Sequence, residues 1–197
     1  MKQATAPLAA LRTYAEAALR AHGIPRDAAR SAVAVALSGH VRDVPGYGLS
    51  CLSRLVARVH HHGKPSRDLK LTSSSRGVVS SLHAPYAVGQ HGATLLTEAV
   101  ADGAASHGVG VGVADLPDIG YGGYYTELLA SKSLVGVVMC AGSNNAIWCS
   151  VPRRVYGTWH ASSPPQIDRA PLTPLSQTRT RTPTSGPRPR WTTTRRL

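Results

Sequence analysis

Apolar and polar residues recur with the period of an α-helix through the first sixty residues of the chain. In the opening stretch, Leu8, Leu11, Ala15 and Leu19 fall on one helical face. Gly23 is positioned to end that helix, and the same periodicity then returns twice. The pattern predicts three helices, which lie within residues 8–22, 25–37 and 49–62.

The period changes to two near residue 69, which favours strands. Leu69 and Leu71 alternate with polar neighbours, and residues 73–76 have the composition of a hairpin turn before a second strand at 78–82. The further elements expected are helices over 91–106 and 125–131 and strands over 109–114 and 134–140. A strand, a helix and a strand of these lengths form a βαβ unit, so part of the sheet should be parallel. The predicted fold class is α/β, with N-terminal helices followed by a mixed sheet.

The periodicity is lost after His160. Residues 161–197 contain 8 Thr, 7 Pro, 7 Arg and 4 Ser, and their few apolar residues have neither period. Such a segment buries too little apolar surface to offset the entropy lost on ordering, so a disordered basic tail is expected. An out-of-frame reading of a GC-rich gene is an alternative origin for this composition. The expected organisation is a body over 1–160, helical over 1–63 and α/β over 64–160, followed by a tail over 161–197.

The net charge of +12 is divided equally between body and tail. A basic tail suggests a nucleic-acid-binding arm, but its only aromatic residue is Trp191, so nucleic acid is not an expected partner. No apolar run approaches the roughly 20 residues of a membrane span, so no membrane association is expected. Three cysteines without metal-ligand spacing, and an N-terminus without a secretory pattern, indicate a reduced cytoplasmic protein.

Three short motifs contain residue types that could bind a metal ion, a dinucleotide or another ligand. The run His60–His62 on a helix points its side chains about 100° apart, so no metal site is expected. The alternating glycines of 108–112 lie inside a strand and not at a strand-to-helix turn, which argues against a dinucleotide fingerprint and indicates close approach of another element. The loop 120–125, Gly-Tyr-Gly-Gly-Tyr-Tyr, follows a strand and is either a ligand loop or a tight turn with packed tyrosines.

Several segments together resemble the malate/L-lactate dehydrogenase family of NAD(P)-dependent oxidoreductases, which differs from the Rossmann-type lactate dehydrogenases. The matching segments are residues 48–56, 89–90, 113–120, 123–125, 134–138 and 157–158. The resemblance covers about residues 8–158 and implies the N-terminal half of that fold, so the body would be a partial oxidoreductase domain. It also implies interconversion of small 2-hydroxy and 2-keto acids, NAD or NADP as cofactor, and a homodimer.

The resemblance places candidate site residues on this chain. Tyr47 and Asp118 stand where the family has two histidines, and Cys51 stands where it has an arginine. Gly120, Gly157 and Thr158 match glycine and threonine positions expected near the cofactor.

All three catalytic groups are therefore replaced. A tyrosine titrates ordinarily near pH 10, an aspartate carboxylate repels an anionic substrate, and a thiol cannot grip a carboxylate as a guanidinium does. The family's second half also has no counterpart in this sequence. We expect a truncated, divergent oxidoreductase without turnover, or alternatively an inactive subunit that pairs with a full-length relative.

Overall fold

The computed structural model describes residues 6–73, 77–141 and 146–152. Contacts divide the chain into two units, residues 1–159 and 160–197, and every described residue belongs to the first. The helices are α1 (Leu8–Ala21), α2 (Arg26–Val41), α3 (Cys51–His62), α4 (Gly89–His107) and α5 (Gly123–Ser131). The strands are β1 (Leu71–Ser73), β2 (Val79–His83), β3 (Val111–Asp115), β4 (Gly136–Cys140) and β5 (Ala146–Ser150).

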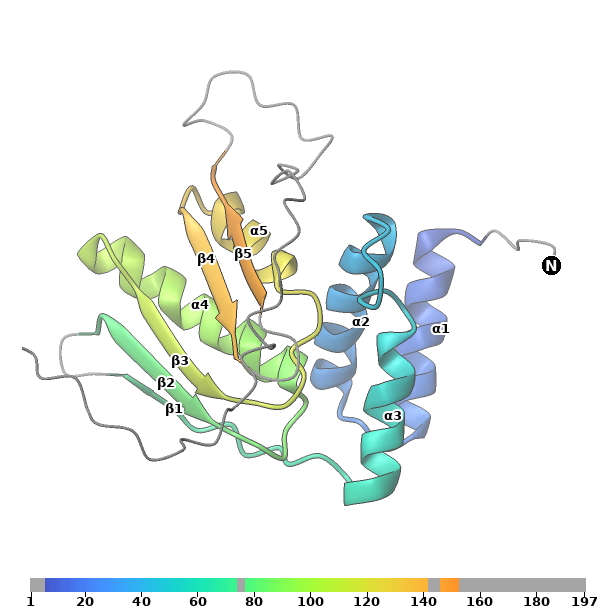
Figure 1. The fold of residues 1–197 in the computed structure, drawn as a ribbon. Coiled ribbons are helices and arrows are strands. Elements are labelled where there is room, and N and C mark those ends of the chain that lie inside the picture. The colour runs from blue at the N-terminus through green and yellow to red at the C-terminus, as the bar shows by residue number, and fades with distance from the viewer. Residues whose placement is uncertain (1–5, 74–76, 142–145, 153–197) are drawn as a thin grey trace, which may run out of the picture. The chain divides into compact units, whose positions relative to one another are not determined.

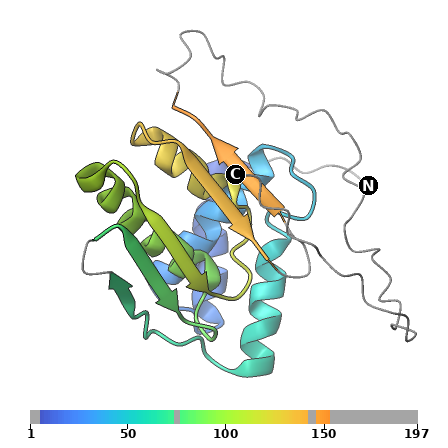
Figure 2. The ribbon, with the colours of Figure 1, turned by 60° about the vertical axis from the view of Figure 1, so that its left-hand side comes forward.

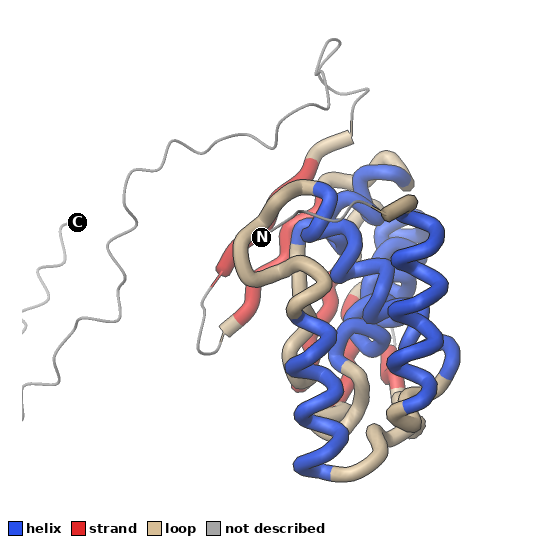
Figure 3. The backbone as a smooth tube through the Cα atoms, turned by 90° about the vertical axis from the view of Figure 1, so that its right-hand side faces the viewer, coloured by secondary structure: helices blue, strands red, loops and turns tan. Residues whose placement is uncertain are grey.

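Helix α2 is the centre of the helical part and packs against α1, α3, α4 and α5. Figure 3 shows the N-terminal helices in front of the strands. Small residues fill the contact, because Ala29, Ala32 and Val33 on α2 are completely buried. Leu19 of α1 and Leu55 of α3 are buried in the same core. With no Phe in the chain, alanine, valine and leucine supply the packing, and such a core is sensitive to small cavities.

The strands form a three-stranded sheet, ordered β1-β2-β3, and a separate hairpin of β4 and β5. Strands β1 and β2 are antiparallel, with Leu71 opposite Leu82, whereas β2 and β3 are parallel and joined by α4. Helix α4 packs closely on β3, since a Cβ added at Gly112 would lie 2.8 Å from Cγ2 of Val100. The prediction that glycines in this strand admit another element is confirmed.

Strands β3 and β4 pack on α4 and α5 with one side only, through Gly112 and Gly136, and Figure 2 shows these helices behind the strands. Four apolar residues of β3, β4 and β5 are largely exposed. They are Val113, Val137, Met139 and Ile147. Val79 and Val111, paired across β2 and β3, are exposed on the same side. We call these six residues the outer face. Parallel strands are usually covered on both sides, so this face is an unusual surface for the outside of a protein.

The α/β class, the N-terminal helices and the mixed sheet are confirmed, with element ends displaced by up to four residues. The βαβ unit was predicted from the strand at 109–114 through the helix at 125–131 to the strand at 134–140, and this placement is wrong. The parallel strands are β2 and β3, joined by α4, whereas β4 pairs with β5 and has no described pairing with β3. Strand β5 was not predicted. None of the described helices is long and apolar enough to cross a membrane, and no cluster of metal-ligating side chains occurs among the same residues. The expectation for the tail falls outside the described residues.

Candidate functional site

The first wall of the candidate site is the loop between α2 and α3. Gly46 there has a positive φ of 79°, which a side chain would strain. Gly39 of α2 lies so close to the carbonyl oxygen of Tyr47 that a Cβ would collide with it. The loop is therefore fixed against α2 and carries Tyr47 to the start of α3.

The second wall is the loop that follows β3. Asp118 Oδ1 accepts a hydrogen bond from the backbone N–H of Gly120 at 2.8 Å, and Gly120 has a φ of 72°. The phenol of Tyr125, a buried residue of α5, donates to the carbonyl oxygen of Ile119 at 2.6 Å. A Cβ at Gly89, the first residue of α4, would lie 2.5 Å from the Asp118 carbonyl oxygen. These contacts fix the loop at the N-terminus of α4.

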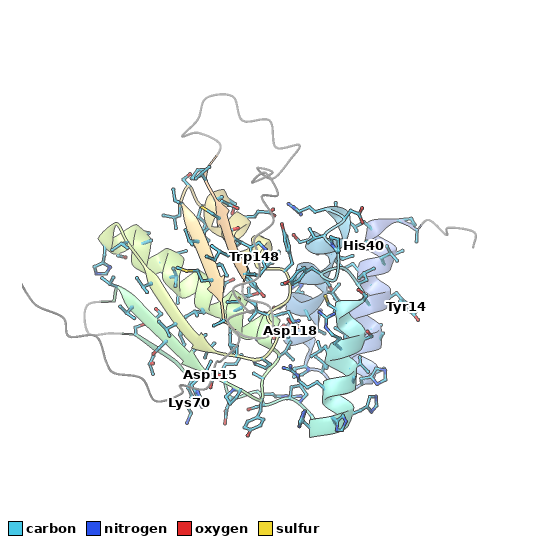
Figure 4. All side chains as sticks on the ribbon, in the orientation of Figure 1. Tyr14, His40, Lys70, Asp115, Asp118 and Trp148 are labelled. Atoms are coloured by element: carbon cyan, nitrogen blue, oxygen red, sulfur yellow. The ribbon has the colours of Figure 1, made fainter. Side chains whose placement is uncertain are left out.

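Arg54 of α3 joins the two walls, because it contacts both Cys51 and Asp118. Figure 4 labels Asp118 between the strands and α3. Arg54 Nη2 lies 3.4 Å from Asp118 Oδ2, 3.3 Å from Cys51 Sγ and 3.3 Å from the Gly46 carbonyl oxygen. The Cys51 thiol also donates to the Gly46 carbonyl oxygen at 3.0 Å. The only guanidinium that contacts Asp118 in the described part of the chain is therefore already paired, and a substrate carboxylate would have to compete with Asp118 for it.

Burial favours the protonated forms of the Tyr47 phenol and the Cys51 thiol. The pKa of the Tyr47 phenol is raised, first by burial and next by the negative charge of Asp118. Burial also raises the pKa of the Cys51 thiol, although Arg54 opposes this shift. The Tyr47 ring makes an edge contact with Trp148 of β5, with ring centroids 6.0 Å apart. A phenol in this setting gives up its proton less readily than a free tyrosine.

Gln90 is a member of the site that sequence reasoning did not single out. Its side chain is buried, and Oε1 has no described hydrogen-bond partner. It lines a cavity of about 20 Å³ together with Cys51, Arg54 and Asp118. That volume holds about one water molecule, and a nicotinamide ring does not fit. This cavity by itself is therefore too small to hold the nicotinamide end of a dinucleotide.

The structure brings most of the sequence-predicted site residues together. Arg54 contacts both Cys51 and Asp118, and the Gly120 N–H donates to the Asp118 carboxylate. The negative charge of Asp118 also contributes to the raised pKa of Tyr47. The predicted residues 157 and 158 lie outside the described residues. Gln90 was missed, and its place in a matching segment could have found it. Arg54 matches a family arginine in the resembling segment 48–56 and was expected to have a structural role on the helix, three residues after Cys51.

The fold of this body is that of a group of solved dehydrogenases. Malate dehydrogenase from Pyrococcus horikoshii OT3 is similar with a TM-score of 0.67 at 17% identity, over 76% of this chain and 47% of that one. Malate dehydrogenase from Entamoeba histolytica gives 0.63 at 15%, over 69% and 38%. Sulfolactate dehydrogenase from Methanocaldococcus jannaschii gives 0.58 at 20%, over 64% and 37%. The chain thus spans less than half the length of each.

The family model for malate/L-lactate dehydrogenase matches residues 6–159. The chain therefore belongs to the malate/L-lactate dehydrogenase family, as its sequence motifs predicted. No curated protein matches the sequence closely enough to count as a relative.

Proposed function

We propose that this chain is an oxidoreductase of the 2-hydroxy acid type by descent, and that it has no turnover on its own. Membership of the family supports the first part, with a nicotinamide cofactor, NAD or NADP, as the hydride carrier of the complete enzymes. The observation that carries the second part is the pairing of Arg54 with Asp118 beside a protonated Tyr47. A substrate carboxylate would have to compete with Asp118 for Arg54, and the pKa values of Tyr47 and Cys51, the acids beside it, are raised away from neutral pH.

The test is the oxidation of NADH and of NADPH by the purified full-length chain with a panel of 2-keto acids. We expect no rate above the background for the natural chain. Any reproducible turnover that follows saturation kinetics would overturn the proposal of inactivity.

A second set of variants tests descent from a working enzyme. The triple variant Tyr47→His, Cys51→Arg and Asp118→His restores the chemical groups that the family pattern has at these positions. We expect it to bind a 2-keto acid such as oxaloacetate more tightly than the natural chain, measured by calorimetry. Tyr14→His, a change at an exposed tyrosine of α1 that lines neither cavity, is the matched control and should have no effect. Equal binding by all three proteins would contradict the assigned positions.

A second candidate function is that of a non-catalytic subunit, and the outer face favours it. Its four valines, Met139 and Ile147 are 39–73% exposed on one side of the strands. Surfaces of this kind are typical of protein contacts. We propose either a homodimer or pairing with a full-length relative, in the cytoplasm, where the unpaired thiols of Cys51, Cys140 and Cys149 would stay reduced. Light scattering of the purified chain, alone and mixed with a full-length family member, distinguishes the two.

A further inference from the structure

A second cavity, of about 330 Å³, lies beside α3 and adjoins the small cavity at Cys51 and Asp118, since Leu55 and Arg58 line both. Its walls are the C-terminal half of α3, residues 63–65, residues 85–87 after β2, and residues 115–117 after β3. The volume is at the lower end of the range in which small-molecule pockets occur, about 300–1,000 Å³. The cavity is therefore large enough for one ring or a short branched chain.

The walls of this cavity are tied together by the backbone. The N–H of Ser66 donates to the carbonyl oxygen of Tyr86 at 2.9 Å, and the N–H of Ala84 donates to the carbonyl oxygen of Asp115 at 2.9 Å. Leu55, which lines the cavity, is buried in the core of the helical part. The cavity is thus formed before any ligand arrives, which lowers the entropic cost of binding.

Basic side chains dominate the charged lining. Arg58 and His62 lie one turn apart on α3, and Lys64 follows directly after the helix. None of the three has an ion pair within the described ranges, although Arg58 is partly buried. The methylenes of Lys64 pack near Gly23, since a Cβ there would lie 3.3 Å from Cε of the lysine. An arginine that is partly withdrawn from water and unpaired is a ready partner for an anion.

The one carboxylate in the lining, that of Asp115, already has a partner. Its Oδ2 lies 3.0 Å from Nδ1 of His83, on the neighbouring strand β2. Figure 4 shows Asp115 at the end of β3. The remaining lining is apolar and aromatic and includes Leu116 and the exposed ring of Tyr86. Arg58 and Lys64 carry two positive charges against the single carboxylate of Asp115, so the cavity has a positive excess.

We propose that this cavity binds a small organic anion, whose carboxylate or phosphate group is held by Arg58 and Lys64 and whose apolar body packs against Leu55, Leu116 and Tyr86. The site does not require hydride transfer and goes beyond the proposed oxidoreductase function. Its test is a binding measurement, so it can succeed or fail independently of turnover.

The probes are benzoate, phenyl phosphate and the uncharged amide benzamide, titrated into the full-length chain and followed by calorimetry. We expect benzoate or phenyl phosphate to bind and benzamide not to bind, because the charge on the ligand is what the two cations recognise. Tighter binding of benzoate assigns the cavity to carboxylates, and tighter binding of phenyl phosphate assigns it to phosphates. Failure of both anions to bind, or equal binding of benzamide, would overturn the proposal.

Substitutions in the lining test whether the anion binds in this cavity. Arg58→Gln and Lys64→Gln should each weaken the anion by about tenfold or more, as expected for loss of a charged hydrogen-bond partner. Arg67→Gln, an exposed arginine of the same segment that does not line the cavity, is the matched control and should leave the dissociation constant unchanged. Asp115→Asn removes the competing carboxylate and should tighten binding, which a damaged fold cannot do. An equal loss in Arg67→Gln, or weaker binding in Asp115→Asn, would contradict the site.

Discussion

The Asp118 carboxylate uses both of its oxygens within the protein, one on Arg54 and one on the Gly120 N–H. The family pattern has a histidine at this position and an arginine at that of Cys51. In this chain the carboxylate and Arg54 neutralise each other instead. At the position where the resemblance implies a proton-transferring histidine, Asp118 instead contacts Arg54 and the Gly120 N–H.

Replacing Asp118 with asparagine should therefore change titration more than stability. The pair with Arg54 is exposed, with side-chain exposures of 54% and 40%, so its loss should cost no more than about 0.5 kcal/mol of unfolding free energy. The amide oxygen can still accept from Gly120. Loss of the negative charge should lower the pKa of Tyr47, which burial would still hold above its ordinary value.

Ultraviolet titration of the phenolate measures this shift. Subtracting the curve of Asp118→Asn/Tyr47→Phe from that of Asp118→Asn isolates Tyr47 from the other tyrosines, and the same subtraction is made on the natural background. An unchanged Tyr47 titration would show that Asp118 does not act on this phenol.

The buried phenol of Tyr125 predicts a loss of stability at alkaline pH. Burial raises its pKa well above 10 in the folded chain, whereas the unfolded chain releases the proton near pH 10. Below pH 10 both states hold the proton, so the full stability is present. Above it the unfolded state binds fewer protons, and the free energy of unfolding should fall as pH rises.

Urea unfolding between pH 8 and 11 tests this dependence. Tyr125→Phe should lose about 1 kcal/mol at pH 8, because the hydrogen bond to Ile119 is missing, and should show a shallower fall above pH 10. Tyr14→Phe, on an exposed side chain of α1, is the control. Equal slopes in all three proteins would contradict the assignment to Tyr125.

Sequence reasoning reached the site only in part, for a physical reason. Tyr47, Cys51 and Asp118 were predicted from family positions, because motif spacing survives replacement of the chemical group, and their role as site residues stays a prediction. The pairing of Arg54 with Asp118 could not be read in this way, since it joins residues 64 positions apart. The unpartnered oxygen of Gln90 was equally hidden, because burial and missing partners are properties of the packed structure.

Among the elements, α4 joins the sheet to the site. It packs on β2 and β3 along its length, and its first residue, Gly89, touches the loop that carries Asp118. A Cβ at Gly89 would lie 2.5 Å from the Asp118 carbonyl oxygen and 2.7 Å from that of Pro117. Backbone atoms cannot rotate out of the way as a flexible side chain would.

Gly89→Ala should therefore destabilise the body by about 1–3 kcal/mol, as overpacking does, in spite of the better helix propensity of alanine. The loop should also shift, which would lengthen the contact between Asp118 and Arg54. Thermal unfolding measures the first effect and the Tyr47 titration the second. Asp102→Ala, on the exposed side of α4, is the control and should stay within about 0.5 kcal/mol. A stable Gly89→Ala variant would contradict the close approach.

Most of the described elements followed from their pattern, and one strand did not. The helical repeats of α1 to α4 extend over three or more turns, so their existence followed from pattern alone. Strand β5, Ala146–Ser150, was missed, although β2, β3 and β4 have the same length and were predicted. Its pairing with β4, and a hydrogen bond of 2.7 Å between Thr126 and Ser150 hydroxyls, depend on the tertiary structure.

For the described body as a whole, the outer face is the least ordinary feature. One side of the strands is covered by α4 and α5, with Gly136 packed on Leu129 and Gly112 on Val100. The other side exposes Val113 to 60% and Met139 to 73%. Burying six such side chains would remove several hundred Å² of apolar surface from water, a gain that favours association over a free monomer.

A lysine on this face should reduce association without harming the fold. Val113→Lys places a charge at an exposed, outward-pointing site of β3, so the unfolding free energy should change by no more than about 1 kcal/mol. Binding of a hydrophobic dye and the concentration dependence of light scattering should both fall. Ser81→Lys, opposite Val113 on β2, adds the same charge without removing apolar surface, and should have the smaller effect. If both variants reduce association equally, charge repulsion and not the apolar face controls it, and the face is no longer evidence for a partner.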